Sequence, residues 1–452
     1  MSAPTASQIL AAFAAKLRFK DIPADVLEHA RRCIIDTVGV ATYGARFPWS
    51  RNLVRYASRY GSGGPCTVLG LPGVRLHAPY AALSNGAFAH AFEQDSLRYP
   101  GAGVHPGATL LPAALAMAEE SGANGKTLLA AFVAGCEVMF RIGAASHHSS
   151  EALGFHAPGL TGPYGAAIAA GRTLGQDAAT LARGLGIAGS LSAGILAFTK
   201  AREGTAVKRL HLGRAAEAGV LAARLAQEDL AGPETVLEGR FGFLETYCRD
   251  PDASRLTAGL GNDWETRKIC IKAFPCHVTA HTPVQAIRQL MERHRFAGAD
   301  AEEILVEGSP KLLSHHDIPE PRDLMQAQYS VPFCVALALY RDPADPESFS
   351  DEALNSPEIR AACRRVRLVQ FPLSETPRSA WHTRISVRLR QGETLLQDSP
   401  SFRGMPESPP SRNEVRAKFM TLCAGLGGAQ AARLLEKLES LEELSTVSLG
   451  SD

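Results

Sequence analysis

Four histidines stand beside glycine, proline or cationic residues, outside the regular apolar patterns of the chain. His105 lies in Gly-Val-His-Pro-Gly, His156 follows Gly-Phe, His211 ends Lys-Arg-Leu-His, and His277 follows Phe-Pro-Cys. Junctions between helices and loops are where a scaffold presents reactive groups. An imidazole titrates near neutral pH and can both take and give a proton. These four are candidate proton-transfer groups, although for any one of them alone a structural role is the first explanation.

A basic segment, 204–216, interrupts a region built mainly from small and apolar residues. It holds Lys208, Arg209, His211 and Arg214 within seven positions. If the segment is helical, Lys208 and His211 share a face because they are three residues apart. A small polyanion would then be a natural partner. The alternative is a solvated basic face, which we expect for Arg209 and Arg214.

Further charged groups could complete such a site. Lys272 could hold a second carboxylate as a point charge. Glu93 and Asp95 follow His90 closely and precede His105, so they could orient an imidazole or relay a proton.

Metal-binding patterns are weak in this chain. His277 and His281 are spaced i, i+4, but Val278 stands where a zinc peptidase would carry its glutamate. The nine cysteines are scattered without a Cys-x-x-Cys motif. We expect the adjacent pairs 147–148 and 315–316 to lie on the surface. Chemistry without a metal is therefore favoured.

A nucleotide-binding loop is not predicted either. Residues 184–189 match Gly-x-Gly-x-x-Gly, but the match falls inside an Ala- and Gly-rich helical stretch with no preceding strand. Close helix packing explains it better.

Helical periodicity dominates the first part of the chain. Apolar residues recur at helical spacing over 7–41, 80–92, 110–121, 125–145 and 164–197. The helix over 80–92 would deliver His90, Glu93 and Asp95 at its C-terminal end, followed by a loop over 96–107. We predict an all-α domain.

Period-two alternation appears after Trp264, most clearly over 383–390, with a turn at 391–394. Together with 303–307 and 366–369 it predicts a half-buried antiparallel sheet, covered on one face by helices over 283–295 and 331–340. Helical spacing returns over 413–444. The fold class is mainly α, with a large helical domain interrupted by a smaller α+β domain.

The composition excludes several classes of function. The chain has 452 residues and a formal net charge of +1, so no overall field would recruit nucleic acid or an anionic membrane. The odd number of cysteines argues against a disulfide framework. No secretory leader and no apolar run long enough to cross a bilayer are apparent. We expect a soluble, cytoplasmic protein.

Several motifs follow one another in a recognisable order, within a likeness that runs from about the first helix to the C-terminal helices. They are 85–95 (Asn-Gly-Ala-Phe-Ala-His-Ala-Phe-Glu-Gln-Asp), 105–107 (His-Pro-Gly), 154–156 (Gly-Phe-His), 204–205 with 208–211 (Gly-Thr and Lys-Arg-Leu-His), 236–243 (Val-Leu-Glu-Gly-Arg-Phe-Gly-Phe) and 272–277 (Lys-Ala-Phe-Pro-Cys-His). This order resembles the MmgE/PrpD family, which includes 2-methylcitrate dehydratase, cis-aconitate decarboxylase and iminodisuccinate epimerase.

The resemblance implies a large helical domain formed by 1–265 and 406–452, with an α+β lid domain over 266–405. It also implies a homodimer without a metal or other cofactor, acting on a small di- or tricarboxylic acid in a cleft between domain and lid. The cleft residues carried over from the decarboxylase branch are Glu93, His105, His156, Lys208, Lys272 and His277, with His211 as a weaker neighbour.

Within that family a hydro-lyase similar to 2-methylcitrate dehydratase is our first expectation, with His105 as the proton-transfer group. A decarboxylase, an epimerase, or a carboxylate-binding protein that has lost catalysis are the alternatives. One departure bears on the choice: Ser96 stands where related sequences commonly carry a further acid, and Arg98 adds a possible carboxylate contact nearby.

Overall fold

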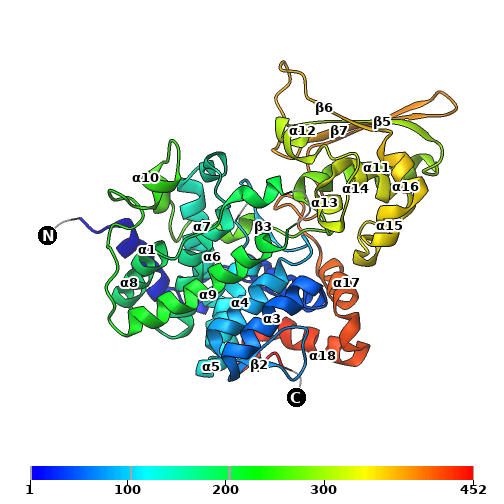
Figure 1. Cartoon of the computed structure of the whole chain (residues 1–452). Coiled ribbons are helices and arrows are strands. Elements are labelled where there is room, and N and C mark those ends of the chain that lie inside the picture. The colour runs from blue at the N-terminus through cyan, green and yellow to red at the C-terminus, as the bar shows by residue number, and fades with distance from the viewer. Residues whose placement is uncertain (1–2, 102–103, 202–204, 451–452) are drawn as a thin grey trace. The chain divides into compact units, whose positions relative to one another are not determined.

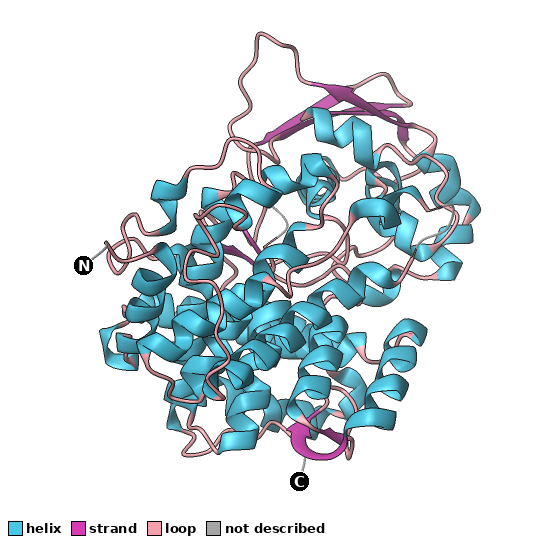
Figure 2. Ribbon diagram, turned by 60° about the vertical axis from the view of Figure 1, so that its left-hand side comes forward, coloured by secondary structure: helices cyan, strands magenta, loops and turns pink. Residues whose placement is uncertain are grey.

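A computed structural model describes residues 3–101, 104–201 and 205–450. The chain divides into two compact units (Figure 1). The larger combines Met1–Lys200, Ala206–Ile271 and Ser411–Asp452, and the smaller combines Ala201–Thr205 and Lys272–Pro410. Helices predominate and strands are few (Figure 2), as the sequence predicted.

The larger unit is helical. Its helices are α1 (Ala6–Lys16), α2 (Ala24–Gly44), α3 (Pro48–Gly61), α4 (Ala78–Ala89), α5 (Pro106–Ser121), α6 (Gly125–Ala145), α7 (Ala157–Thr173), α8 (Ala178–Gly189), α9 (Val207–Gln227), α10 (Phe243–Tyr247), α17 (Arg412–Leu422) and α18 (Gly428–Glu439). Local signals explain several of the starts. Asn124 and Asp177 accept hydrogen bonds from backbone N–H groups in the first turns of α6 and α8. Proline stands in the first turn of α4, α5 and α7, where its missing N–H costs nothing.

Small residues let α4 and α9 pack closely. A Cβ atom added at Gly213 would lie 2.2 Å from the carbonyl oxygen of Leu83, and one at Gly86 would lie 2.9 Å from the Cα atom of Gly213. The match to a nucleotide fingerprint has the same explanation: Gly186, on α8, packs against the backbone of Gly232. Close packing therefore fixes where α9 places its first turn.

Helix α6 corrects one expectation, because it is long and apolar enough to cross a membrane. However, 94% of its most apolar window is buried inside the protein. Such burial is typical of the core helix of a globular unit.

Two small strand pairs belong to the larger unit. β1 (Ser62–Thr67) pairs antiparallel with β2 (Arg75–Leu76), and β3 (Leu97–Arg98) pairs antiparallel with β4 (Ile269–Cys270). β3 lies within 96–107, which the sequence predicted to be entirely loop. Residues 102 and 103 of that stretch lie outside the described residues.

The smaller unit has a four-stranded sheet in the order β6-β5-β7-β8. Its strands are β5 (Ala301–Gly308), β6 (Val366–Gln370), β7 (Thr383–Leu389) and β8 (Thr394–Ser399). Its helices are α11 (His281–His294), α12 (Pro310–His316), α13 (Leu324–Tyr329), α14 (Val331–Tyr340), α15 (Asp351–Asn355) and α16 (Pro357–Cys363). The predicted hairpin joins β7 and β8, but β5 and β6 are parallel, which corrects the expectation of a purely antiparallel sheet.

The C-terminal helices return to the larger unit. Phe419 of α17 and Leu435 and Leu438 of α18 are buried in its core. The Lys418 side chain also contacts Asp36 of α2 and the backbone carbonyl oxygen of Gln94. The last part of the chain is thus tied to the turn that follows α4.

Candidate functional site in the helical unit

The turn after α4 gathers three titratable side chains. His90 is the C-terminal cap of α4, and its Nδ1 lies 2.9 Å from Oδ1 of Asp95. Between them Glu93 adopts a left-handed backbone conformation (φ 56°), which reverses the chain. All three side chains are buried. The helix end predicted from the sequence therefore delivers these groups to one place.

His105, the N-terminal cap of α5, binds the other oxygen of the same carboxylate. Its Nδ1 lies 2.8 Å from Oδ2 of Asp95 and 3.0 Å from the backbone carbonyl oxygen of Ser96. A carbonyl and an ionised carboxylate can only accept, so Nδ1 must carry the proton. In the neutral imidazole Nε2 is then the basic nitrogen, which makes it the atom available for proton transfer.

The pKa values of Asp95 and His90 are both shifted in this network. Burial acts to raise the pKa of Asp95, but the charges of His90 and His105 and their hydrogen bonds outweigh it, so this pKa lies well below its usual range. Burial lowers the pKa of His90 to about 3, although Asp95 opposes that shift. At neutral pH the cluster therefore holds a carboxylate beside an uncharged His90.

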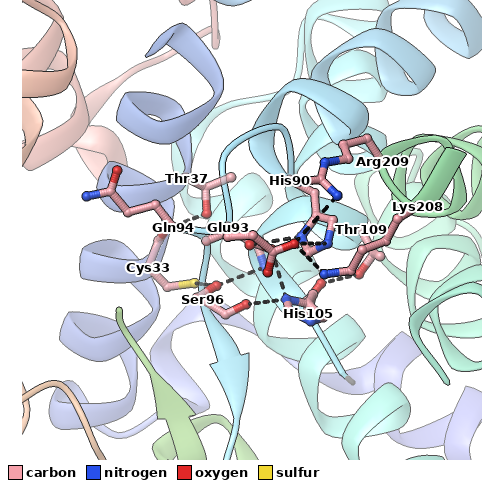
Figure 3. A network of polar contacts seen from close by, with 12 residues as sticks. Cys33, Thr37, His90, Glu93, Gln94, Ser96, His105, Thr109, Lys208 and Arg209 are labelled. Atoms are coloured by element: carbon pink, nitrogen blue, oxygen red, sulfur yellow. Dashed lines mark hydrogen bonds and ion pairs between the residues drawn. The ribbon is translucent and has the colours of Figure 1, made fainter. Parts of the chain in front are cut away.

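Glu93 forms a buried ion pair with the first turn of α9. Lys208 Nζ donates to Oε1 of Glu93, and Nη1 of Arg209 lies 3.7 Å from the same oxygen (Figure 3). Two cations thus face one carboxylate. Helix α9 confirms that the basic segment is helical at Lys208. Arg209 is buried, so the expectation of a solvated side chain there was wrong, whereas Arg214 is exposed and pairs with Glu217.

His156, the N-terminal cap of α7, contacts His211 of α9. Their two Nδ1 atoms are 2.9 Å apart, and the ring of Phe198 packs edge-on against both imidazoles. Burial lowers the pKa of His156 well below its usual value. The charge of Lys208 adds to that shift, as do the charges that His211, His90 and His105 carry when protonated. Since these charges act on His156, the two histidine groups share one electrostatic neighbourhood.

Comparison with known proteins places this arrangement in a family. Residues 8–256 match the MmgE/PrpD N-terminal domain, and residues 274–443 match the MmgE/PrpD C-terminal domain. The chain belongs to the MmgE/PrpD family.

Relatives with assigned activities cover nearly the whole chain. A cis-aconitate decarboxylase of Aspergillus terreus is 30% identical over 462 residues, covering 96% of this chain and 93% of its own. The cis-aconitate decarboxylase of Mus musculus is 28% identical, with 96% and 90% covered, and that of Homo sapiens is 27% identical, with 94% and 89% covered. This MmgE/PrpD protein is therefore an enzyme of the lyase class.

Two of the predicted site residues of this MmgE/PrpD chain belong to the smaller unit. Lys272 is buried, and the His277 ring stacks on His316 with ring centres 4.1 Å apart. His316 is buried, which corrects the expectation of a surface pair at 315–316. That Lys272 and His277 serve the same site as His105 stays a prediction from the family.

His277 and His281, the i, i+4 pair that gave a weak zinc signal in the sequence, have separate partners in the structure. Nε2 of His281 accepts from the backbone N–H of Phe274, and its Nδ1 lies 3.7 Å from Sγ of Cys276. Nδ1 of His277 instead faces Thr279. In the helical unit, His90, Asp95 and His105 offer ligand atoms within 4.8 Å of one another, a spacing that could hold a metal ion. In the structure, however, the two Nδ1 atoms of this group bind Asp95.

Ser96 and Arg98, the two residues near the site that differ from the common family pattern, both have structural partners. Ser96 Oγ accepts from the backbone N–H of Gly107, at the start of α5, and contacts Sγ of Cys33. Arg98 donates to Glu265 in a buried pair, so it is not the spare carboxylate contact that the sequence suggested.

Sequence reasoning underestimated Asp95 and His90, which lie at the centre of the network. Asp95 was considered only as one of two acids that could orient an imidazole. The signal that identifies it is its position five residues after a helix-ending histidine and ten before His105. Nothing in that spacing reveals that one carboxylate binds both rings.

Proposed function

We propose that the chain is a lyase acting on a small tricarboxylic acid, and that its reaction is decarboxylation of cis-aconitate or a close analogue. The observation that carries the proposal is the bond from His105 Nδ1 to Asp95, which fixes the imidazole with Nε2 available for proton transfer. The named activities of the relatives support decarboxylation over the dehydration that we expected first.

In this proposal the cationic groups bind the substrate. Lys208 would hold a substrate carboxylate as a point charge, in exchange for or alongside its contact with Glu93. Arg209, which also faces Glu93, would keep that glutamate compensated during the exchange. Binding through several carboxylates would fix the reacting carbons relative to His105.

The proposed chemistry transfers one proton. The bond between a substrate carbon and its carboxylate breaks, carbon dioxide leaves, and the electron pair remains on the carbon skeleton. Nε2 of protonated His105 then donates its proton to the resulting carbanion. Asp95 stabilises the imidazolium before this step, since its carboxylate accepts from Nδ1.

Dehydration of a hydroxy-tricarboxylate such as 2-methylcitrate remains the second candidate. Removal of a proton and loss of a hydroxyl group require a base and an acid, and the paired His156 and His211 offer a second acid–base group near Lys208.

A substrate screen tests the proposal. Purified protein would be supplied separately with cis-aconitate, citrate, 2-methylcitrate and iminodisuccinate, and gas release and absorbance of unsaturated products would be recorded. Carbon dioxide from cis-aconitate, lost in the His105→Ala variant, is the expected result. Water loss from 2-methylcitrate without gas would support the second candidate. If one of these compounds stabilises the protein against heat and none of them is converted, the chain is a carboxylate-binding protein.

The homodimer stays a prediction that sedimentation would test.

A further inference from the structure

The proposed decarboxylation uses His105 and assigns no step to the His156–His211 pair. With 2.9 Å between the two Nδ1 atoms, one must donate and the other must accept. Because a neutral imidazole carries one proton, the two rings then hold opposite tautomers. The donor ring has a bare Nε2, and the acceptor ring carries its proton there.

The two rings differ in access to solvent. His156 is buried with 5% of its surface exposed, whereas His211 is half-buried. His211, one helical turn after Lys208 on α9, is therefore the ring of the pair that is more accessible to solvent.

The surroundings hold His211 in place. The ring of Phe198 packs against it edge-on with centres 5.9 Å apart. A Cβ atom added at Gly194 would lie 3.1 Å from Nδ1 of His211, so only a residue without a side chain leaves this nitrogen its room. The carbonyl oxygen of Gly194 accepts from the backbone N–H of His156, which fixes the partner ring as well.

We propose that His211 is a positioning residue that also relays protons between solvent and His156 during the lyase reaction. This inference rests on the proposed function, because the relay returns to His105 the proton that the proposed reaction consumes. The inference goes beyond the proposed function because it assigns His211 to proton exchange and not to substrate binding.

The relay balances at every step. After His105 has protonated the carbanion, His156 gives the proton on its Nε2 toward His105 and so restores the imidazolium there. His156 receives a proton at Nδ1 from Nδ1 of His211. His211 takes a replacement at its own Nε2 from solvent. Each ring exchanges one tautomer for the other, and neither carries a lasting charge.

The charges around the pair agree with a neutral relay. The charge of Lys208 acts on both rings, and His90 and His105 also act on His156 when they are protonated. Burial and Lys208 lower the pKa of His211. Both rings are thus uncharged at neutral pH, the form in which tautomer exchange works.

Two variants distinguish proton relay by His211 from a purely structural role of its imidazole ring. His211→Asn keeps an amide group where Nδ1 lies but cannot relay a proton, and His211→Phe keeps the packing against Phe198 but has no nitrogen. We expect kcat to fall at least tenfold in both, with KM within threefold of the wild type. Added imidazole should restore turnover of the Asn variant and leave the wild type unchanged, which a structural defect would not allow.

The outcomes are decisive. Full turnover of His211→Asn, or a loss that imidazole does not restore although substrate binding and thermal unfolding are unchanged, would overturn the relay. If the wild type turns over none of the four acids, the proposed function fails independently. NMR of ¹⁵N-histidine-labelled wild-type protein then still tests the pair: a proton shared by two Nδ1 atoms, lost in His211→Phe, is expected, and its absence in the wild type would overturn the arrangement.

Discussion

The carboxylate of Asp95 accepts hydrogen bonds from two imidazoles, one on each oxygen. It therefore fixes the tautomer of both rings at once, since each Nδ1 must carry its proton. A carboxylate so placed also stabilises an imidazolium when His105 gains a proton. At the scale of single residues, the site depends on this acid as much as on the histidine expected to transfer the proton.

Replacing Asp95 by Asn tests that dependence. The amide can accept from only one ring and presents N–H groups to the other, so it would favour the wrong tautomer of an imidazole. We expect kcat to fall about a hundredfold or more. Asp229→Asn, at an exposed position paired with Arg183, is the matched control and should keep full activity. Equal activity of the two variants would refute the role of Asp95.

His90 makes stability depend on pH. Its pKa in the folded protein is about 3, below its ordinary value, so the unfolded chain binds a proton that the folded one does not. Stability contributed by neutral His90 is therefore complete above about pH 6.5 and is lost as the pH falls toward 3, by about 1.4 kcal/mol per pH unit. Urea unfolding at pH 7 and pH 5 should show a smaller loss for His90→Asn than for the wild type, by about 2 kcal/mol.

The control for this titration is His294→Gln, at an exposed position on α11. It should lose as much stability as the wild type between the two pH values. A His90→Asn variant with an unchanged pH dependence would show that His90 is not the group responsible.

Sequence reasoning performed unevenly at the residue scale. His105 and His156 are candidates from the sequence because each stands at a junction of loop and helix, and Lys208 because it lies in a basic segment. All three lie at the start of a helix in the structure. The shared use of Asp95 and the burial of Arg209 were not, because both depend on how α4, α5 and α9 pack. Side-chain pairing between distant segments leaves no trace in local spacing.

At the scale of elements, the contact between α4 and α9 positions the ion pair of Glu93 with Lys208. Gly213 on α9 lies against the backbone of α4, and no side chain fits between them. Any separation of these helices would move Lys208 away from the turn that carries Glu93 and Asp95.

Gly213→Ala should therefore destabilise the protein and weaken its activity. The added methyl group would meet the carbonyl oxygen of Leu83 at 2.2 Å, and relief requires a shift of backbone, so we expect a loss of about 3 kcal/mol. Gly184→Ala is the matched control on α8, since its nearest neighbour would be an ordinary contact at 3.8 Å. That variant should be neutral or gain up to about 1 kcal/mol. Thermal unfolding distinguishes the two, and equal midpoints would contradict the packing argument.

The elements themselves were largely predictable. Helix α14 has the predicted bounds, and the strands of the smaller unit lie where period-two alternation placed them. The parallel pairing of β5 with β6 was not predictable, because alternation reports which face of a strand is buried and not the direction of its neighbour. Helix α3 was missed, since its surface is mostly exposed and its apolar pattern is short.

At the scale of the whole molecule, the C-terminal helices α17 and α18 belong to the same larger unit as the N-terminal helices. Lys418 of α17 reaches Asp36, whose side chain is fully buried on α2, at 2.5 Å. The same ammonium group donates to the backbone of Gln94, next to Asp95. The separation of these segments in sequence explains why composition predicted the return of the helices but not this contact.

Lys418→Met should leave the Asp36 carboxylate without this cation and cost about 3 kcal/mol of stability. The double variant Asp36→Asn/Lys418→Met removes the buried charge as well and should be more stable than the single one. Lys16→Met, at an exposed position on α1, serves as the control. Urea unfolding measures all three, and a double variant less stable than Lys418→Met would contradict the expected coupling.

The helix starts at the site have a practical consequence for assays. His105 and His156 cap the beginnings of α5 and α7, and Lys208 lies in the first turn of α9. The beginning of a helix attracts anions through its unpaired N–H groups, and here a lysine adds a full charge. Phosphate, sulfate and citrate in a buffer would compete for the same place as a tricarboxylate. Activity should therefore be sought in buffers of cationic or zwitterionic amines with chloride, because a phosphate buffer could conceal a working enzyme.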